Sequence, residues 1–209
     1  MTYDKKLIAH KLARWEKAVS GFSLPSWENI PDIGLYMDQV IVLLSQYLGL
    51  ISPADDKETE EETDPSETKI FSSSAINNYV RLKIMPAPVK RRYYRVHIAY
   101  LIIIFTLKQA VSINIVKEML SNEMPEESLQ QLYTDYVYKH HEATMLFTSI
   151  VRECASDVLD PEKTGDNLVS SFVIQEALIA GFSRVLTEKL VNLKGQSFED
   201  AVSNEVPRP

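Results

Sequence analysis

Polar side chains gather on one side of a short predicted helix, residues 73–84. At about 100° per residue, its apolar side holds Ile76, Tyr79, Val80, Leu82 and Ile84. Opposite them, an arc about 100° wide, which we call the polar arc, holds Ser74, Asn77, Asn78 and Arg81. Asn pairs with adenine and Arg with guanine through two hydrogen bonds each. The polar arc therefore predicts a surface that reads base edges in double-stranded DNA.

A run of basic and aromatic residues follows this helix directly. Pro86 and Pro88 end the helix, and the run that follows consists of Lys90, Arg91, Arg92, Tyr93, Tyr94 and Arg95. It predicts a short turn or hairpin, a wing of residues 89–95, whose charges contact phosphates and position the helix. A polar helix in the major groove beside a basic wing is the layout of a winged helix. Lys83 falls on the apolar side, which suggests that the helix ends before it.

The charge is distributed unevenly along the chain. Formal net charge is −7, yet residues 68–117 contain nine basic residues and no Asp or Glu. Subtracting nine from −7 leaves −16 for the rest of the chain. Such asymmetry indicates a face that binds a polyanion on an acidic body. A solvated surface without a partner is the alternative, although such surfaces normally mix both signs.

Helices must position these residues, because six glycines in 209 residues leave few tight turns. Helical periodicity predicts six further helices, in residues 3–19, 33–48, 95–110, 113–120, 125–159 and 167–194. Asp32, Ser112 and Asp166 are the expected caps at helix starts, and Gly21 and Gly195 are expected at helix ends. The helix in residues 95–110 is apolar on nearly every side, which predicts a central core element.

The expected fold is mainly all-α, with four parts along the chain. An N-terminal helix occupies residues 1–24, and a winged helix-turn-helix domain occupies residues 25–121. An acidic linker, residues 52–68, is inserted in that domain; it has eight acids and one lysine, and we expect it to be mobile. A helical region in residues 122–195 and a disordered tail in residues 196–209 complete the chain.

The predicted polar helix and basic wing together resemble the DNA-binding motif of the MerR-type regulators of transcription. The stretch SSSAINNYVRLKIMP is similar to their turn, second helix and exit, with Ile76 at the core leucine position and Tyr79 at the aromatic position. KRRYYRVHIAYL is similar to their wing and the helix after it, with Arg91 and Tyr93 at the arginine and tyrosine positions. The resemblance implies a MerR-like winged helix in a homodimer bound to DNA.

A closer resemblance is to the bacterial family called domain of unknown function 1836. The phrases IPDIGLYMDQVI, INNYV and HIAYLIIIFTLK, together with Pro88-Val89-Lys90-Arg91-Arg92-Tyr93, are similar to its pattern. They cover roughly residues 27–120. The implied fold is again MerR-like, and the implied activity is regulation of transcription.

Other chemistry is not predicted. His140, His141 and Glu142 are adjacent, but adjacent helical side chains point about 100° apart, and the sequence offers no third ligand at i+4. No Gly-x-Ser-x-Gly turn and no glycine-rich phosphate loop occurs in the chain. We expect no enzyme activity, no metal and no cofactor.

The chain is expected to be cytoplasmic and to have no membrane partner. A single cysteine, Cys154, rules out an intramolecular disulfide and fits a reducing compartment. The most apolar run, residues 98–105, has eight residues, whereas a membrane span needs ~20. No apolar core of signal-peptide length follows the N-terminus.

Alternatives to a MerR-like homodimer remain at this point. A TetR-like repressor has a similar length and a helical effector domain, although the Pro86-x-Pro88 exit and the basic wing argue against it. A helical protein–protein interaction module that has lost DNA binding would fit the net charge of −7. The apolar C-terminal helices would form a dimer interface or a pocket for a small-molecule effector, and the two readings are compatible.

Overall fold

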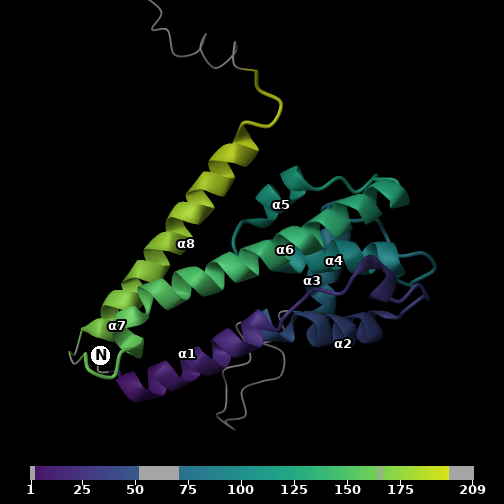
Figure 1. Ribbon diagram of the computed structural model, residues 1–209. Coiled ribbons are helices and arrows are strands. Elements are labelled where there is room, and N and C mark those ends of the chain that lie inside the picture. Colours follow the sequence, from purple (N-terminus) through teal and green to yellow (C-terminus); the bar gives the residue numbers. More distant parts are fainter. Residues whose placement is uncertain (1–2, 52–70, 164, 166, 198–209) are drawn as a thin grey trace, which may run out of the picture.

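The computed structural model describes residues 3–51, 71–163, 165 and 167–197 (Figure 1). The helices are α1 (Lys5–Ser20), η1 (Trp27–Asn29), α2 (Met37–Leu48), η2 (Gly49–Ile51), α3 (Ser73–Arg81), α4 (Arg95–Leu107), α5 (Ile113–Met119), α6 (Glu126–Cys154), α7 (Ser156–Leu159) and α8 (Leu168–Asn192). In these residues, β structure is limited to two isolated antiparallel bridges, Leu35 with Tyr93 and Val89 with Arg92. The mainly helical architecture predicted from the sequence is therefore confirmed.

The start of α2 differs from the prediction. Asp32 does not cap the helix; Tyr36 is the N-cap residue, and its backbone N–H donates to Gln39 Oε1 at 2.9 Å. The helix begins four residues later than expected because Leu35 is extended and pairs with Tyr93 through two hydrogen bonds of 2.8 Å each. The pairing of distant backbone segments overrides the local helical pattern in residues 33–36.

Other helix limits follow the sequence more closely. Ser112 caps α5 as predicted, its Oγ accepting from the Ile115 N–H at 3.4 Å. The expected helix over residues 125–159 is divided at Ala155 into α6 and α7. The acidic linker in residues 52–68, the cap at Asp166 and the tail from residue 198 lie outside the described residues.

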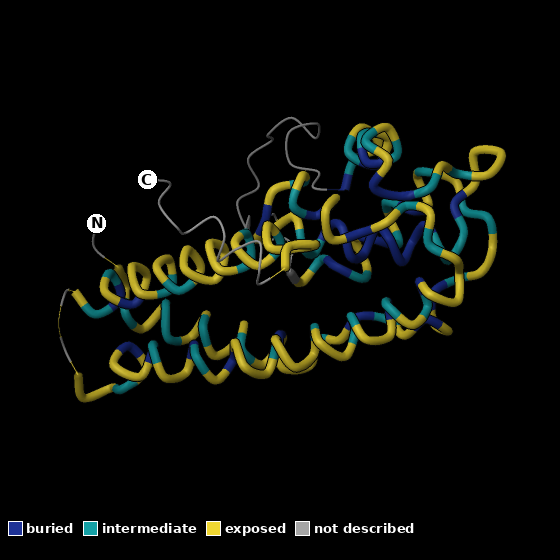
Figure 2. The backbone as a smooth tube through the Cα atoms, turned by 90° about the horizontal axis from the view of Figure 1, so that it is seen from above, coloured by how far each residue is buried: buried dark blue, intermediate teal, exposed yellow. Residues whose placement is uncertain are grey.

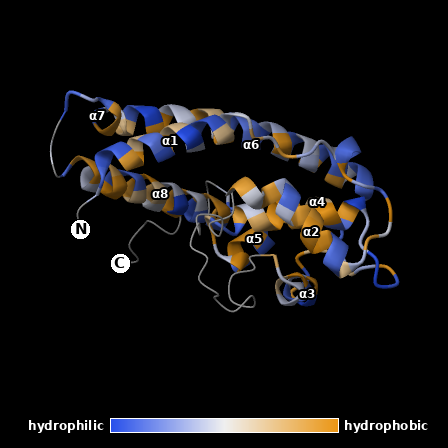
Figure 3. Ribbon diagram, turned by 90° about the horizontal axis from the view of Figure 1, so that it is seen from below, coloured by the Kyte–Doolittle hydropathy of each residue, from blue (hydrophilic) through white to orange (hydrophobic). Residues whose placement is uncertain are grey.

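A large core surrounds α4, which is buried at nine consecutive positions, residues 97–105. The helix packs against α2 and α6, and Figure 3 shows its hydrophobic colouring together with that of α2 and α5. Helix α3 adds Ile76 and Tyr79 to this core, and the Tyr79 ring meets Phe105 edge-on with 5.5 Å between ring centroids. The central position predicted for α4 is confirmed.

A second, smaller core lies at the far end of α6. It is formed by Val151, Ala155, Val158, Val169 and Phe172, with Ile8 and Leu12 of α1 packed against it. An ion pair between Glu16 and Arg152 also joins α1 to α6. The N-terminal helix thus packs beside α6 and α7, as Figure 1 shows.

Helix α8 is apolar over much of its length, although its apolar residues do not form one unbroken run. It is long and apolar enough, by length and composition, to cross a membrane, and only 11% of its most apolar window is buried. Figure 2 shows buried residues concentrated around the large core, whereas the long helices are mostly exposed.

Candidate nucleic-acid interface

Helix α3 presents the polar arc on the surface of the large core. Ser72 Oγ accepts from the Ala75 N–H at 3.2 Å and caps the helix. Ile76 is fully buried and Tyr79 is 2% exposed. Because these two residues anchor one side, the opposite side faces solvent, and Ser74, Asn77 and Arg81 are exposed while Asn78 is half-buried.

Two residues of the polar arc contact each other. Arg81 Nη2 donates to Asn78 Oδ1 at 2.7 Å, across one turn of the helix. This bond restricts the guanidinium to the α3 surface and leaves its other N–H groups free to donate. The Asn78 side chain holds Arg81 in position, so the two side chains form one polar unit on the surface of α3.

The end of α3 explains why Lys83 did not fit the helical pattern. Lys83 has a φ of 56° and lies beyond the helix. The Ile84 N–H donates to the Tyr79 carbonyl and the Lys83 N–H to the Val80 carbonyl, both at 3.0 Å. These two bonds define a Schellman motif, in which glycine is the usual left-handed residue. The helix therefore ends before Lys83, as the sequence suggested.

The basic run forms a two-residue β-hairpin, which we call the basic hairpin (residues 89–92). Val89 and Arg92 exchange both backbone hydrogen bonds, at 2.9 and 3.0 Å. Lys90 and Arg91 form the tip, with φ values of 49° and 64°. Two central residues with positive φ define a type I′ turn, which favours Asn-Gly. Both tip side chains are exposed and have no hydrogen-bond or ionic partner among the described residues.

Arg92 attaches the basic hairpin to the loop before α2. Its guanidinium lies 4.5 Å from the centre of the Tyr36 ring and donates to the Tyr36 hydroxyl at 2.9 Å and the Gly34 carbonyl at 3.1 Å. A Cβ on Gly34 would lie 2.7 Å from Arg92 Cδ. The absence of a side chain at Gly34 lets Arg92 lie flat against this loop.

Tyr93 and Arg95, which the sequence placed on the DNA-contacting surface, have structural positions instead. Tyr93 is 3% exposed, pairs with Leu35, and has its pKa raised by burial. Arg95 Nε donates to the Ile30 carbonyl at 3.0 Å, and its guanidinium lies 3.9 Å from Asp32. The alternation of the short extended segment turns Tyr93 inward, and the first turn of α4 directs Arg95 toward residues 30–32.

A buried histidine that the sequence analysis missed supports the basic hairpin. His97 is 5% exposed; its Nδ1 accepts from the Tyr94 N–H at 3.0 Å, and its Nε2 lies 3.1 Å from the Ala87 carbonyl oxygen. Burial lowers the pKa of His97. The side chain therefore joins the segments that enter and leave the hairpin. The sequence signal for this histidine was the spacing of a capping box, in which the side chain of the third helical residue accepts a hydrogen bond from the N–H of the N-cap residue.

The structure arranges the candidate residues in two groups. The polar arc lies on α3, and the basic hairpin lies against the loop that leads into α2. No hydrogen bond or ion pair between residues that the structure describes joins the two groups directly. Helix α2 connects them, because it contacts α3 and its preceding loop holds the hairpin. Over the same described ranges, no group of three His, Cys, Asp or Glu is arranged to hold a metal.

These observations define a class of structure: a mainly helical core that carries a short polar helix and a basic hairpin on its surface. The chain belongs to the family of the domain of unknown function DUF1836, whose model matches residues 25–141. That match covers α2 through the first half of α6, including both candidate groups. No curated protein and no solved structure matches the chain.

Proposed function

We propose that this chain is a sequence-specific DNA-binding regulator of transcription with a MerR-like winged-helix design. Helix α3 would enter the major groove and read base edges through Asn77, Asn78 and Arg81. The basic hairpin would hold backbone phosphates through Lys90 and Arg91. Ser74, at the exposed start of α3, would contact the DNA backbone.

The tip of the basic hairpin is the observation that carries the proposal. A left-handed conformation costs about 1–2 kcal/mol for a residue with a side chain, and two cations adopt it side by side. Neither cation gains a hydrogen bond or ion pair within the described chain in return. Locally strained residues cluster at functional sites. Their positive charges at the end of a projecting turn would gain most from contact with a polyanion such as DNA.

The geometry of α3 supports the reading of bases. The helix is anchored by Ile76 and Tyr79, so its exposed side chains start from a fixed backbone. Arg81 is held by Asn78 before any ligand arrives, which lowers the entropy lost on binding. The described part of the acid-free segment, residues 71–117, contributes both groups, so no carboxylate on either element repels phosphate.

A paired substitution tests this function without disturbing the fold. Lys90→Asn with Arg91→Gly installs the dipeptide that a type I′ turn favours and removes two charges. Binding of a fluorescent random duplex, measured by anisotropy at about 50 mM salt, should weaken, and the slope of log K against log salt should fall by about one unit for each charge removed.

The matched control removes two exposed charges from α1. Lys6→Gln with Arg14→Gln changes the net charge equally and lies away from both candidate groups, so it should leave the salt slope unchanged. Equal losses in the two double variants would indicate an unspecific charge effect. A wild-type protein that does not bind duplex at low salt would overturn the proposal.

One observation favours a second candidate, a helical interaction module without DNA binding. The exposed side chains of α8 form a large apolar surface, which is typical of a site for another protein. In that case the duplex experiment would show no binding for any variant, while the surface of α8 would still have a partner.

A further inference from the structure

An unpartnered apolar ridge runs along α8. Residues four apart on a helix form a continuous ridge of side chains, and on α8 one such row is apolar throughout. The row, which we call the α8 ridge, consists of Ile174, Leu178, Phe182, Leu186 and Leu190. These five side chains are 60%, 56%, 74%, 59% and 60% exposed. The described part of the chain therefore leaves the whole row uncovered.

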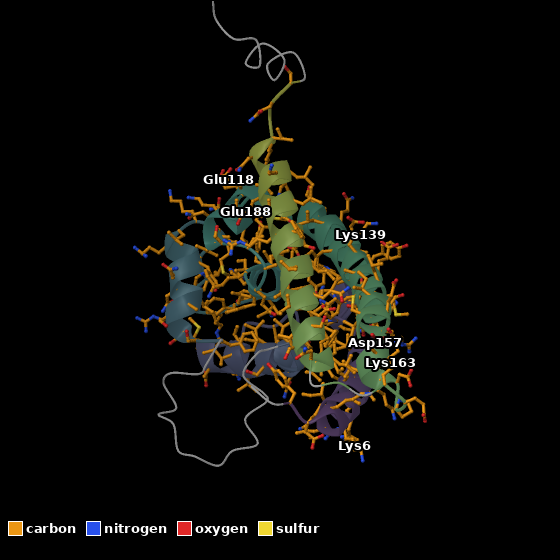
Figure 4. All side chains as sticks on the ribbon, turned by 90° about the vertical axis from the view of Figure 1, so that its left-hand side faces the viewer. Lys6, Glu118, Lys139, Asp157, Lys163 and Glu188 are labelled. Carbon is orange, nitrogen blue, oxygen red and sulfur yellow. The ribbon has the colours of Figure 1, made fainter. Side chains whose placement is uncertain are left out.

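The rest of the molecule contacts α8 chiefly toward its two ends. Val169 and Phe172, in the first two turns, are buried against the small core. Near the other end, α8 contacts α5, and Lys194 Nζ donates to the Glu118 carbonyl at 2.5 Å. Figure 4 shows α8 crossing the front of the molecule, with Glu118 beside its upper part. A helix fixed at both ends presents its outer surface as a rigid platform.

A low row, which we define as the two small residues at the centre of the neighbouring i, i+4 row, flanks the α8 ridge. The neighbouring i, i+4 row contains Ala177 and Gly181, both exposed. Apart from its chain neighbours and the nearby backbone of α8, no atom of the described residues lies within 4 Å of a Cβ built on Gly181. Glycine inside a helix is unfavourable, and no neighbour among the described residues requires it here. The tall ridge and the low row together have the form that helices use when ridges pack into grooves.

The α8 ridge is symmetric about Phe182. Leu178 and Leu186 lie four residues on either side of Phe182, and Ile174 and Leu190 lie eight residues on either side. A two-fold axis through Phe182 and perpendicular to the helix would place each member against its counterpart in an antiparallel copy. Isologous interfaces require this self-complementarity.

We propose that a second copy of this chain covers the α8 ridge, with the two α8 helices packed antiparallel about a two-fold axis at Phe182. Phe182 of each copy would pack against Phe182 of the other, beside the groove over Ala177 and Gly181. The inference deepens the proposed function, since it names the surface that would join two DNA-binding protomers, but it does not depend on DNA binding.

The area is sufficient for a stable dimer. The five ridge residues, together with Val185 and Leu193, are all at least half exposed. If each buries about 100 Å², the helix supplies on the order of 700 Å² per copy, close to the roughly 800 Å² of a standard interface.

The charges on α8 favour a protein partner over a bilayer. Arg184 pairs with Glu188 at 2.9 Å, and Lys189 follows directly. These charged groups lie within the helix, where a membrane span would carry them into hydrocarbon. In a dimer, Arg184 and Glu188 lie about 160° and about 120° around the helix from Phe182 and remain in contact with water. Lys189 falls on the same side as Phe182, near the end of the helix, where its long side chain can reach water.

Sedimentation velocity over about 1–100 μM protein tests the proposal at concentrations where a standard interface is populated. The wild-type protein should be a dimer, and Phe182→Asp should be a monomer with unchanged helical circular dichroism. Ala180→Asp is the matched control: Ala180 is also an exposed apolar residue of α8, but it lies two residues from Phe182, about 200° away around the helix, and outside both the ridge and the low row. This control should remain a dimer.

Disulfide trapping tests the antiparallel register. In a Cys154→Ser background, Phe182→Cys should crosslink to its own copy on mild oxidation. Leu178→Cys should crosslink with Leu186→Cys in a mixture more readily than with itself. A wild-type monomer, a dimer that survives Phe182→Asp, or crosslinks that favour a parallel register would each overturn the proposal.

Vesicle flotation distinguishes the membrane alternative. Wild-type protein that floats with phosphatidylcholine or phosphatidylglycerol vesicles, and loses this property with Phe182→Asp, would show that lipid covers the ridge and would overturn the dimer. If the chain dimerises as described but does not bind duplex DNA, the proposed function fails while this inference stands.

Discussion

The Nε2 atom of His97 lies 3.1 Å from the carbonyl oxygen of Ala87, on the segment that enters the basic hairpin. Its Nδ1 accepts a hydrogen bond from the Tyr94 N–H, on the segment that leaves the hairpin. Since Nδ1 acts as the acceptor, the proton of the neutral ring is on Nε2, which donates to Ala87. The hairpin is therefore held at its base by a neutral imidazole.

This arrangement predicts a loss of stability in acid. Burial lowers the pKa of His97 in the folded protein, so the unfolded chain binds the proton more readily. Stability should be constant above about pH 6.5 and fall as the pH decreases below it, by up to about 1.4 kcal/mol per unit. Urea denaturation between about pH 5 and 8 measures this dependence.

Substitution separates the contribution of His97 from that of the half-buried His140, whose pKa is also lowered by burial. His97→Gln should remove part of the pH dependence and shift the amide resonances of the hairpin. His140→Gln should remove a different part and leave those resonances in place. A pH dependence identical in wild type and His97→Gln would contradict the neutral-imidazole assignment.

Tyr79→Phe should stabilise the protein. The Tyr79 hydroxyl is buried and has no hydrogen-bond partner among the residues that the structure describes, and burial raises its pKa to about 12. Removing it keeps the ring against Phe105 and should raise the free energy of unfolding by about 1 kcal/mol.

Tyr133→Phe is the control for this change. The Tyr133 hydroxyl donates to the Pro25 carbonyl at 2.9 Å, so its removal should lower the free energy of unfolding by about 1 kcal/mol or more. Thermal unfolding of both variants gives the sign directly; destabilisation by both would show that Tyr79 has a partner in solution.

The polar arc and the basic hairpin should differ in their effect on DNA binding. On a site chosen by selection from random duplexes, Asn77→Ala or Arg81→Ala should cost about 1–3 kcal/mol and relax the preference at one or two base pairs. Lys90→Ala should weaken all duplexes about equally. Asn78→Ala, which frees the Arg81 guanidinium, should give a smaller loss at the Arg81 position. Uniform losses from Asn77→Ala would show that α3 does not read bases.

Gly34→Ala should loosen the hairpin. A Cβ at this position would lie 2.7 Å from Arg92 Cδ and 3.1 Å from Arg92 Cβ, so Arg92 must leave the Tyr36 ring. We expect a loss of about 1 kcal/mol, the size of an exposed cation–π contact. At Gly21, by contrast, the nearest atom is 3.7 Å away, so Gly21→Ala should be tolerated. Equal melting temperatures for the two variants would mean that Arg92 is not fixed in this way.

Local patterns in the sequence were sufficient to predict the helices and the turn of the hairpin. The apolar sides of residues 95–107 require a central helix, Ser112 identifies the start of α5, and the prolines before Lys90 separate α3 from the hairpin. These signals depend on neighbours in sequence, which is why they can be read without a structure.

The misplaced residues depend on long-range contacts. The pairing of Leu35 with Tyr93 delayed the start of α2 and turned Tyr93 into the core, and no periodicity in residues 33–36 indicates that pairing. Arg95 lies among basic neighbours in sequence, but its partners Ile30 and Asp32 come from a segment more than sixty residues earlier. The distribution of charge in the sequence indicated a basic segment. Only the fold shows which of its cations are exposed and which are bound to other parts of the chain.

The small core beside α7 has a consequence for how the chain can be divided. All its buried members, and the residues packed against them, lie outside residues 25–141, the segment that matches the family. They come from both flanks of that segment, with α1 on one side and the end of α6, α7 and α8 on the other. The two flanks are therefore halves of a single appendage. A fragment trimmed at one end alone would expose the apolar surface of the remaining half, so trimming should remove both flanks or neither.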